Sequence, residues 1–362
     1  MSRLTGAAYH RRPNFPWNIL SALLIPFGLI YGLILSLRAR AYRQGWFSAA
    51  RPVCRVVSVG NLTLGGTGKT PVTAWLARDL KDSGQAVAVV SRGYRGSREG
   101  WCCVVSDGAT RLLDAGQAGD EPVLLADALP GVPVIISARR SIGVETAVSR
   151  FSSRIVICDD AFSHLALRRD LDLVLIHGRD GLGNGRCFPA GPLREPAGAI
   201  RRAGAVLLNV TAGEEPEVEP EIRRSGFTGP IFRFRYGQVR LASLSDRRSV
   251  EPAADKPLLA FAAIARPEDF FQGLARAGWP VAASRVFPDH HLYTPSDLSA
   301  LIALAKSQNI SRLATTAKDA VKLPAKLPAN VEILVADFSL EGPEGELRRL
   351  SDFVAARLRE TI

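Results

Sequence analysis

The sequence predicts an α/β protein with a doubly wound parallel sheet, a second, smaller α/β domain and an N-terminal apolar membrane helix. Short runs of β-branched residues alternate with helical patterns, a glycine-rich loop follows the first of these runs, and an uncharged stretch lies near the N-terminus. Strands that are apolar along their whole length are typical of a parallel sheet covered by helices on both faces.

Length and composition limit the possible classes. The chain has 362 residues, which exceeds the about 100–200 residues of a typical domain and indicates two packed domains with an appendage. A hydrophobic content of 47% excludes a disordered or collagen-like chain. The net charge of +11 indicates an anionic partner. The five cysteines contain no C-x-x-C pair, so we expect reduced thiols rather than disulfides or a zinc site.

The first predicted element is an apolar segment. Residues 19–37 carry no charge, and at about 1.5 Å per residue they nearly cross a hydrocarbon core of about 30 Å. We therefore interpret residues 1–45 as a membrane anchor helix with basic flanks. Arginines lie on both sides, so orientation stays open, as does a helix that lies in the membrane interface. A buried core helix and a cleaved signal peptide are further alternatives, although the apolar run exceeds the about 7–15 residues of a signal peptide.

Residues 46–221 are predicted to form the doubly wound domain. Its apolar runs, each short enough for a buried strand, are residues 55–59, 86–91, 132–137, 154–158, 171–176 and 205–210. The acidic, proline-containing stretch 214–221 is interpreted as a solvated linker.

Residues 222–255 are predicted to be connecting strands and linker, because residues 230–236 alternate apolar and basic side chains. Residues 256–362 repeat an α/β pattern and form the predicted C-terminal α/β domain. Its expected strands are residues 257–264, 281–287, 312–315 and 331–335, with helices near 268–277 and 296–307 and a final basic amphipathic helix that ends near Arg359.

The strongest local motif is the loop GNLTLGGTGKTP at residues 60–71. It follows a predicted strand and precedes a predicted helix, which is the context of a P-loop, and this makes the larger sheet P-loop NTPase-like. Closely spaced glycines let backbone N–H groups bind phosphate at a helix N-terminus. Thr63 replaces the first glycine of the G-x-x-x-x-G-K-[ST] pattern, so the loop is a variant. The predicted nucleotide-binding residues are Gly65, Gly66, Thr67, Gly68, Lys69 and Thr70.

Phosphate and metal chemistry explain these residue types. Lys69 would reach the β- and γ-phosphates of ATP, and the Thr70 hydroxyl would bind Mg²⁺. Asp159 and Asp160 follow the predicted strand 154–158 and supply the acidic metal-binding position at the carboxyl end of a strand. A surface turn is the alternative interpretation of these two aspartates.

Other motifs discriminate among nucleotide-binding families. A GTPase would carry N-K-x-D, but the nearest candidate, TAKD at residues 316–319, has the wrong spacing, and no ABC signature is present. The remaining motifs are SRGY at 91–94, GDEP at 119–122, DDAFSH at 159–164, GPLREP at 191–196 and FPDHH at 287–291. Together with the loop and the apolar segment, they resemble the tetraacyldisaccharide 4′-kinases, the lipid A 4′-kinases of Gram-negative bacteria. The resemblance runs in the same order from residue 17 to about residue 323.

The resemblance implies a reaction and a place. Members of this family transfer the γ-phosphoryl group of ATP to the 4′-hydroxyl of a tetraacyldisaccharide 1-phosphate and yield lipid IVA at the cytoplasmic face of the inner membrane. It implies ATP and Mg²⁺ as cofactors, and a lipid A precursor and an anionic membrane surface as partners. We expect a monomer. No nucleic-acid motif accompanies the basic charge, so nucleic acid is not an expected partner.

The resemblance also implies roles for individual residues. Asp120 matches the proposed general base, and a histidine of FPDHH is expected to pair with it, with His290 and His291 equally suitable. Asp120 is also expected to cap a helix, a role that is compatible with catalysis. The residues expected at the lipid's sugar and phosphate are Arg92, Tyr94, Arg140, His164, Arg194 and Glu195.

Two departures from the family pattern affect these roles. DDAFSH has Ala161 and Ser163 where the family usually has glycine and glutamine, so a glutamine contact to substrate is either missing or bridged by water. Arg95-Gly96 stands where the family usually has Gly-Arg, which leaves the reach of that arginine open.

Two alternative functions remain. One is a membrane-associated P-loop NTPase or kinase with another acceptor, and the other is a catalytically silent nucleotide-binding scaffold.

Overall fold

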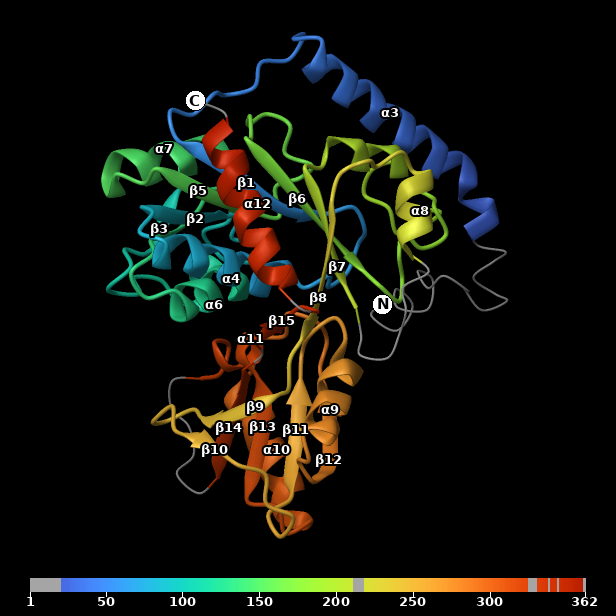
Figure 1. Cartoon of the computed structure of the whole chain (residues 1–362). Coiled ribbons are helices and arrows are strands. Elements are labelled where there is room, and N and C mark those ends of the chain that lie inside the picture. Colours follow the sequence, from blue (N-terminus) through green and yellow to red (C-terminus); the bar gives the residue numbers. More distant parts are fainter. Residues whose placement is uncertain (1–20, 211–217, 325–330, 338, 344, 361–362) are drawn as a thin grey trace.

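The computed structural model describes residues 21–210, 218–324, 331–337, 339–343 and 345–360. The chain forms a larger unit and a smaller unit, each built around its own sheet (Figure 1). The predicted α/β class with a parallel sheet is confirmed.

The larger sheet has nine strands in the order β15-β8-β7-β6-β1-β5-β2-β4-β3. Neighbours are parallel except β3 against β4 and β15 against β8. The six predicted apolar runs are all strands of this sheet, whereas β3 and β15 were not predicted. The strands are β1 (Arg55–Asn61), β2 (Val87–Ser91), β3 (Cys103–Ser106), β4 (Val134–Ile136), β5 (Ile155–Asp159), β6 (Leu171–His177), β7 (Ala205–Asn209), β8 (Ile231–Tyr236) and β15 (Leu340–Glu341).

Helices cover both faces of this sheet. Alternate residues of β1 face opposite sides, so Val57 and Val59 pack in the core beneath α4, while Val56 packs with Val144 of α7 on the other face. Val218 and Ile222 of α8 are buried, so part of the expected solvated linker is a packed helix. The helices are α4 (Lys69–Asp82), α5 (Ala115–Ala118), α6 (Asp120–Ala128), α7 (Arg140–Phe151), the 3-10 helix η1 (Ala197–Arg202) and α8 (Val218–Arg224).

The smaller sheet has six strands in the order β10-β9-β14-β13-β11-β12. Strands β14, β13, β11 and β12 are parallel to one another. β9 pairs antiparallel with β14, and β10 pairs antiparallel with β9 at one edge of the sheet. The elements are β9 (Arg240–Ser243), β10 (Ser249–Val250), β11 (Leu258–Ala262), α9 (Pro267–Arg276), β12 (Val281–Val286), α10 (Pro295–Ser307), β13 (Arg312–Thr316), α11 (Ala317–Ala320) and β14 (Glu332–Asp337).

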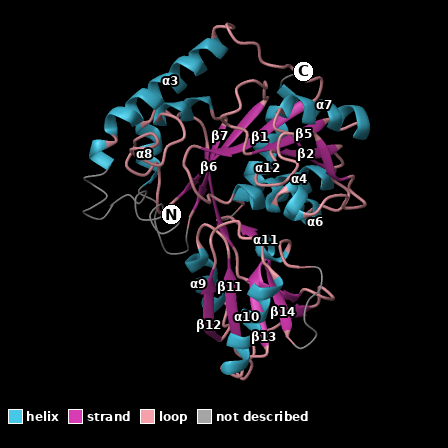
Figure 2. Ribbon diagram, turned by 180° about the vertical axis from the view of Figure 1, so that it is seen from behind, coloured by secondary structure: helices cyan, strands magenta, loops and turns pink. Residues whose placement is uncertain are grey.

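The chain returns to the larger unit after β14. β15 pairs with β8, and α12 (Glu346–Glu360) then packs on the larger sheet (Figure 2). The apolar face of α12 buries Leu350, Val354 and Leu358 in the same core as Val57. The last helix, which was expected within the domain of residues 256–362, thus belongs to the larger unit because its apolar stripe is buried there.

No helix in the described part of the chain has the length and apolar character needed to cross a membrane. The prediction of an apolar membrane helix is therefore wrong for the described part of residues 19–37, and residues 19 and 20 lie outside that part. The observed helix, α3 (Ile25–Arg43), begins later than predicted and includes Arg38 and Arg40 in its last turns.

One face of α3 packs on the larger unit. Gly28 and Gly32 are buried, and a Cβ at Gly28 would lie 2.8 Å from the Cys187 carbonyl oxygen and 2.9 Å from the Ala190 Cβ. Ser21 Oγ donates to the Ala190 carbonyl at 2.8 Å. Because Gly28 and Gly32 have no side chains, α3 lies directly against the backbone of residues 187–190.

We predict that Gly28→Leu loosens α3 from this loop. Overpacking of this kind costs about 1–3 kcal/mol, so Cys187, which is 8% exposed, should be alkylated roughly tenfold faster. Peptide mapping by mass spectrometry after timed alkylation measures this rate. Leu29→Ala, on the exposed face of the same helix, is the matched control and should leave the rate unchanged. Equal protection of Cys187 in both variants would contradict the packing described above.

Candidate active site

The glycine-rich loop after β1 leads directly into the start of α4. Gly65 and Gly68 have φ values of 103° and 85°, which favour glycine, and Gly68 is the N-cap of α4. The Thr67 hydroxyl is buried and has no hydrogen-bond partner among the described residues. Free N–H groups at a helix N-terminus, together with its dipole, suit an anion such as phosphate.

Lys69, the first residue of α4, lies over this loop. Its Nζ donates to Asn61 Oδ1 at 3.1 Å and lies 3.5 Å from Asp160 Oδ1. Asn61 Nδ2 in turn donates to the Thr63 carbonyl at 2.7 Å. Sequence reasoning missed Asn61; its signal is a buried amide at the last position of β1, directly before the loop.

Asp159 is the last residue of β5 and Asp160 directly follows it, but the two have opposite electrostatic environments. Asp159 Oδ1 accepts from Thr73 Oγ1 at 3.0 Å, whereas Oδ2 is buried and unpaired among the described residues. Burial, and then the negative charges of Glu121 and Asp160, raise the pKa of Asp159 to about 7.

Asp160 has the opposite shift. It accepts two hydrogen bonds from Arg194 Nη1 at 2.9 and 3.0 Å. Burial raises the pKa of Asp160, but Lys69 and Arg194 lower it more, to about 2.

The environment of Asp159 fits a divalent cation. Its unpaired carboxylate oxygen lies beside α4, where Thr70 is one turn before Thr73 on the same helix face. Oxygen ligands of this kind suit Mg²⁺, which keeps several waters and binds substrate phosphates. The described residues contain no group of three or more His, Cys, Asp or Glu side chains able to hold a metal ion. A cation here would therefore need oxygens from a bound phosphate.

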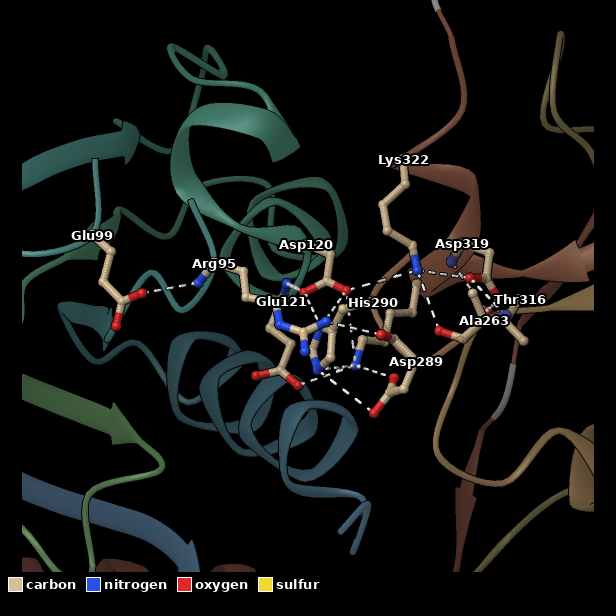
Figure 3. Close-up of polar contacts among 11 residues, drawn as sticks. Arg95, Glu99, Asp120, Glu121, Ala263, Asp289, His290, Thr316, Asp319 and Lys322 are labelled. Carbon is tan, nitrogen blue, oxygen red and sulfur yellow. Dashed lines mark hydrogen bonds and ion pairs between the residues drawn. The ribbon is translucent and has the colours of Figure 1, made fainter. Parts of the chain in front are cut away.

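A second cluster joins the two units at Asp120. His290 Nδ1 lies 2.8 and 3.0 Å from the two Asp120 carboxylate oxygens, and the histidine comes from the loop after β12 of the smaller unit (Figure 3). His291 instead contacts Asp297 Oδ2 at 3.0 Å and stacks on Phe287. The structure thus pairs His290 with Asp120.

We expected Asp120 to be the N-cap of α6, but it is the first residue of that helix. Gly119, with φ of 89°, is the N-cap, and Asp120 Oδ1 accepts from the Glu121 N–H at 2.9 Å. The expected cap residue is displaced by one position because only glycine readily adopts the conformation required there.

Two lysines that sequence reasoning missed also approach Asp120. Lys318 Nζ and Lys322 Nζ each lie 3.8 Å from Asp120 Oδ2. Burial raises the pKa of Asp120, but the His290 hydrogen bond and the lysine charges lower it more, to about 2. Lys318 lies within TAKD, the segment rejected as a guanine motif, and its proximity to Asp120 depends on tertiary packing that no local pattern reveals.

Tyr94 and Arg95 flank the histidine. The Tyr94 ring contacts the His290 ring edge-on at 5.8 Å between centroids. Arg95 Nη1 donates to the Asp289 carbonyl at 2.9 Å, and Arg95 has φ of 64° at the position where the family usually has glycine. The replacement of the usual glycine by Arg95 therefore places an arginine side chain across the boundary between the two units.

Other predicted substrate residues are held by the protein itself. Arg140 is buried and donates to the Ser137 carbonyl at 2.7 Å and to the Asp159 carbonyl at 3.2 Å, so it braces the end of β5. Glu195 is buried and pairs with Arg202 Nη2 at 2.8 Å.

His164 and Arg92 complete the predicted set. His164 lies in the turn after β5, and burial followed by Arg140 and other arginines lowers its pKa to about 4, so the ring is neutral at pH 7. Arg92 is exposed and pairs with Glu99 at 3.2 Å. Of the predicted substrate residues, Arg92 and Tyr94 are the more exposed to solvent.

A parallel sheet with an anion cradle, a cation-accepting carboxylate and a carboxylate–imidazole pair defines an α/β enzyme of the phosphotransferase class. The family model described as tetraacyldisaccharide-1-P 4′-kinase, LpxK, matches residues 20–356. The chain belongs to this family.

Named relatives agree with this assignment. The chain is 37% identical over 352 residues to a tetraacyldisaccharide 4′-kinase of Desulfatibacillum aliphaticivorans, covering 96% of this chain and 95% of the relative. It is 43% identical over 314 residues to that of Geobacter sulfurreducens, covering 86% of each chain. A crystal structure of LpxK from Aquifex aeolicus in complex with ATP aligns with a TM-score of 0.75 at 29% identity, covering 94% of this chain and 99% of that chain.

The opposite environments of the paired aspartates yield a stability prediction. The pKa of Asp159 is raised on folding, so its contribution to stability is present at low pH and is lost as the pH rises through about 7. Asp159→Asn should therefore raise the melting temperature at pH 8 by at least about 2 °C, measured without nucleotide and with EDTA. The gain should shrink at pH 5.

Asp160→Asn is the matched control. The pKa of Asp160 is lowered on folding, so its stabilisation is present at pH 8, and its loss leaves Lys69 and Arg194 without their partner. This variant should melt at a lower temperature than the parent. Shifts of the same sign in both variants would rule out the proposed electrostatics.

Proposed function

We propose that this chain is an ATP-dependent kinase that transfers the γ-phosphoryl group of ATP to the 4′-hydroxyl of a tetraacyldisaccharide 1-phosphate and so forms lipid IVA for lipid A biosynthesis. The observation that carries the proposal is the Asp120–His290 pair beside a glycine-rich loop, in a chain of this family. An acceptor hydroxyl needs a base, and a nucleoside triphosphate needs an anion cradle.

At the nucleotide end, the loop acts as a P-loop. Backbone N–H groups of residues 65–70 bind phosphate oxygens, and Lys69 moves from Asp160 to the β- and γ-phosphates. Thr70 and Asp159 would hold Mg²⁺, which neutralises charge on the transferring phosphoryl group. Arg194 keeps Asp160 ionised and fixed beside Lys69.

At the acceptor end, Asp120 accepts the proton of the 4′-hydroxyl while His290 orients its carboxylate. A pKa of about 2 makes Asp120 a weak base, which suits a loose transition state in which the hydroxyl loses its proton late. Tyr94, which contacts His290, and Arg92, two residues before it, are both solvent-exposed and suit contacts with the sugar and phosphate of the lipid.

We predict that Asp120→Ala lowers kcat for lipid phosphorylation by about 10²–10⁴-fold, because it removes the base. The assay follows transfer of ³²P from ATP to the disaccharide 1-phosphate lipid and determines the position of the new phosphate. Phosphate at the 4′-hydroxyl supports the proposal. ATP hydrolysis without lipid phosphorylation would favour an NTPase or a kinase with another acceptor, and binding without turnover would favour a scaffold.

Membrane association is the second part of the proposal. The outer face of α3 exposes large apolar side chains, and its end carries Arg38, Arg40 and Arg43, a combination suited to a helix that lies in an anionic membrane interface. Arg38 Nη2 also donates to the Ser163 carbonyl of DDAFSH at 3.1 Å, which ties this face to the site. The large exposed apolar residues of α3 and of the turn after it are Phe27, Leu29, Ile30, Tyr31, Leu33, Ile34, Leu37, Trp46 and Phe47.

This arrangement suits a lipid acceptor whose acyl chains stay in the bilayer. ATP is cytosolic, so we place the enzyme at the cytoplasmic face of the bacterial inner membrane. One chain supplies every candidate site residue, so we propose that the monomer is the active unit.

We predict that Leu29→Glu with Leu33→Glu weakens binding to vesicles at least about tenfold, since these side chains are 68% and 59% exposed and burial of each contributes about 1.5–3 kcal/mol. Flotation with vesicles of phosphatidylglycerol and phosphatidylethanolamine measures the bound fraction. Leu112→Glu, an exposed leucine remote from α3 in the sequence, is the control and should bind as the parent does. An unchanged bound fraction in the double variant would show that another surface contacts the membrane.

A further inference from the structure

The segment TAKD holds its side chains in fixed positions beside the site. Asp319 is fully buried and accepts hydrogen bonds from the Ala263 N–H at 3.1 Å and from Thr316 Oγ1 at 2.6 Å (Figure 3). It also forms an ion pair with Lys322 at 2.8 Å. These contacts tie the turn after β13 to the end of β11, so the preceding residue, Lys318, projects from a rigid support.

Lys318 crosses from the smaller unit to α6 of the larger unit. Its Nζ lies 3.3 Å from Glu121 Oε1 and 3.8 Å from Asp120 Oδ2. It also lies 3.7 Å from Asp289 Oδ1 and 3.4 Å from His290 Nε2. The side chain of Lys318 is 19% exposed, so these contacts are only weakly screened by water.

The contacts on both sides of the His290 ring point to one protonation form, because the Asp120 carboxylate can only accept a hydrogen bond from Nδ1 and Lys318 lies beside Nε2. An ammonium group can only donate hydrogen bonds, so it is compatible with Nε2 only when that nitrogen has a free lone pair. The neutral ring then carries its proton on Nδ1, which faces Asp120 at 2.8 Å. Lys318, His290 and Asp120 thus form a chain of donors that ends on the carboxylate.

Some of the other charged groups around the His290 ring favour its protonation, and others oppose it. Asp289 Oδ2 lies 3.7 Å from His290 Nε2 and favours the doubly protonated ring, but Lys318 pairs with the other oxygen of the same carboxylate. The Tyr94 ring contacts the His290 ring edge-on. Asp120 favours a protonated ring, and Lys322 offsets part of its charge. Lys318 therefore opposes protonation of Nε2, to which its Nζ lies at 3.4 Å.

We propose that Lys318 is a positioning residue that holds His290 as the neutral Nδ1–H tautomer, so that the imidazole orients Asp120 without forming an imidazolium ion pair with it. This inference rests on the proposed function, in which Asp120 receives the acceptor's proton. It assigns the TAKD turn a role in the reaction that neither guanine binding nor helix packing explains.

The kinetic test compares Lys318→Met with Lys318→Arg. Lys318→Met should lower kcat for lipid phosphorylation about 10- to 100-fold, the size expected for loss of a hydrogen bond to a charged group, with KM for ATP changed less than about twofold. Loss of the positive charge favours ring protonation, so the acidic limb of the pH profile of kcat should move upward by about one pH unit. Lys318→Arg keeps the charge and should restore most of both effects.

Lys306→Met, on the exposed surface of α10, is the matched control and should leave kcat and the pH profile unchanged. A uniform loss of kcat in Lys318→Met with no displacement of the acidic limb would indicate a purely structural role and overturn the inference. Unchanged kcat would overturn it as well.

A spectroscopic test does not require turnover. Long-range ¹H–¹⁵N spectra of the full chain labelled at histidine nitrogens should show one neutral Nδ1–H ring at pH 8, assigned by its absence in His290→Gln. In Lys318→Met the doubly protonated form of this ring should become more populated, because Asp120 still holds the proton on Nδ1 while the cation beside Nε2 is gone. An Nε2–H or doubly protonated His290 in the parent protein would overturn the inference even if Lys318→Met failed to fold. A parent protein with the Nδ1–H ring but no lipid phosphorylation would refute the proposed function alone.

Discussion

The hydrogen bond between His290 and Asp120 is the interaction on which the site depends. The two residues are 170 positions apart, and each belongs to a different unit. Asp120 is fixed by the start of α6, and His290 by a loop of the smaller sheet, so the pair exists only when both sheets are formed and docked. Arg95 and Lys318 reinforce the same boundary from opposite sides. The chemistry of the acceptor end is thus a property of the boundary between the units and not of either unit alone.

The nucleotide end depends on a different constraint, the cost of burying charge. Asp160 is matched by Lys69 and Arg194, whereas Asp159 keeps one oxygen without a protein partner among the described residues. A buried unpaired carboxylate is unfavourable unless a cation reaches it. The fold tolerates this local instability because the parallel sheet around it is apolar and tightly packed. Two adjacent residues therefore differ in role: Asp160, just after β5, forms stabilising ion pairs, whereas Asp159, the last residue of β5, keeps a carboxylate oxygen available for a cation.

Sequence patterns predicted the parts of the fold that depend on local periodicity. The apolar strands of the larger sheet, the loop before α4 and the aspartates that end β5 were all visible as runs or motifs. The edge strands β3 and β15 were not, because short antiparallel strands at a sheet edge lack a continuous apolar run. The membrane-spanning prediction failed for the described part of its range because α3 begins later than the apolar run and takes in the arginines that follow it.

The site was predictable to the level of motifs and not beyond. FPDHH presents two adjacent histidines, and only the backbone of the loop decides that His290 faces Asp120 while His291 faces Asp297. Arg140 and Glu195 carry charges typical of binding residues, yet both are buried against protein partners. Lys318 has no distinguishing local pattern, because its position matters only after distant segments are brought together.

The return of the chain through β15 to α12 has a consequence for synthesis of the protein. Leu350, Val354 and Leu358 complete the core of the larger unit, although most of that core is made before residue 240. A ribosome therefore releases the whole smaller unit before the segment that seals the larger one. During this interval the sheet of the nascent larger unit carries an uncovered apolar strip, the kind of surface that chaperones bind. The order of segments along the chain thus delays completion of the larger core until Glu346–Glu360 has been translated.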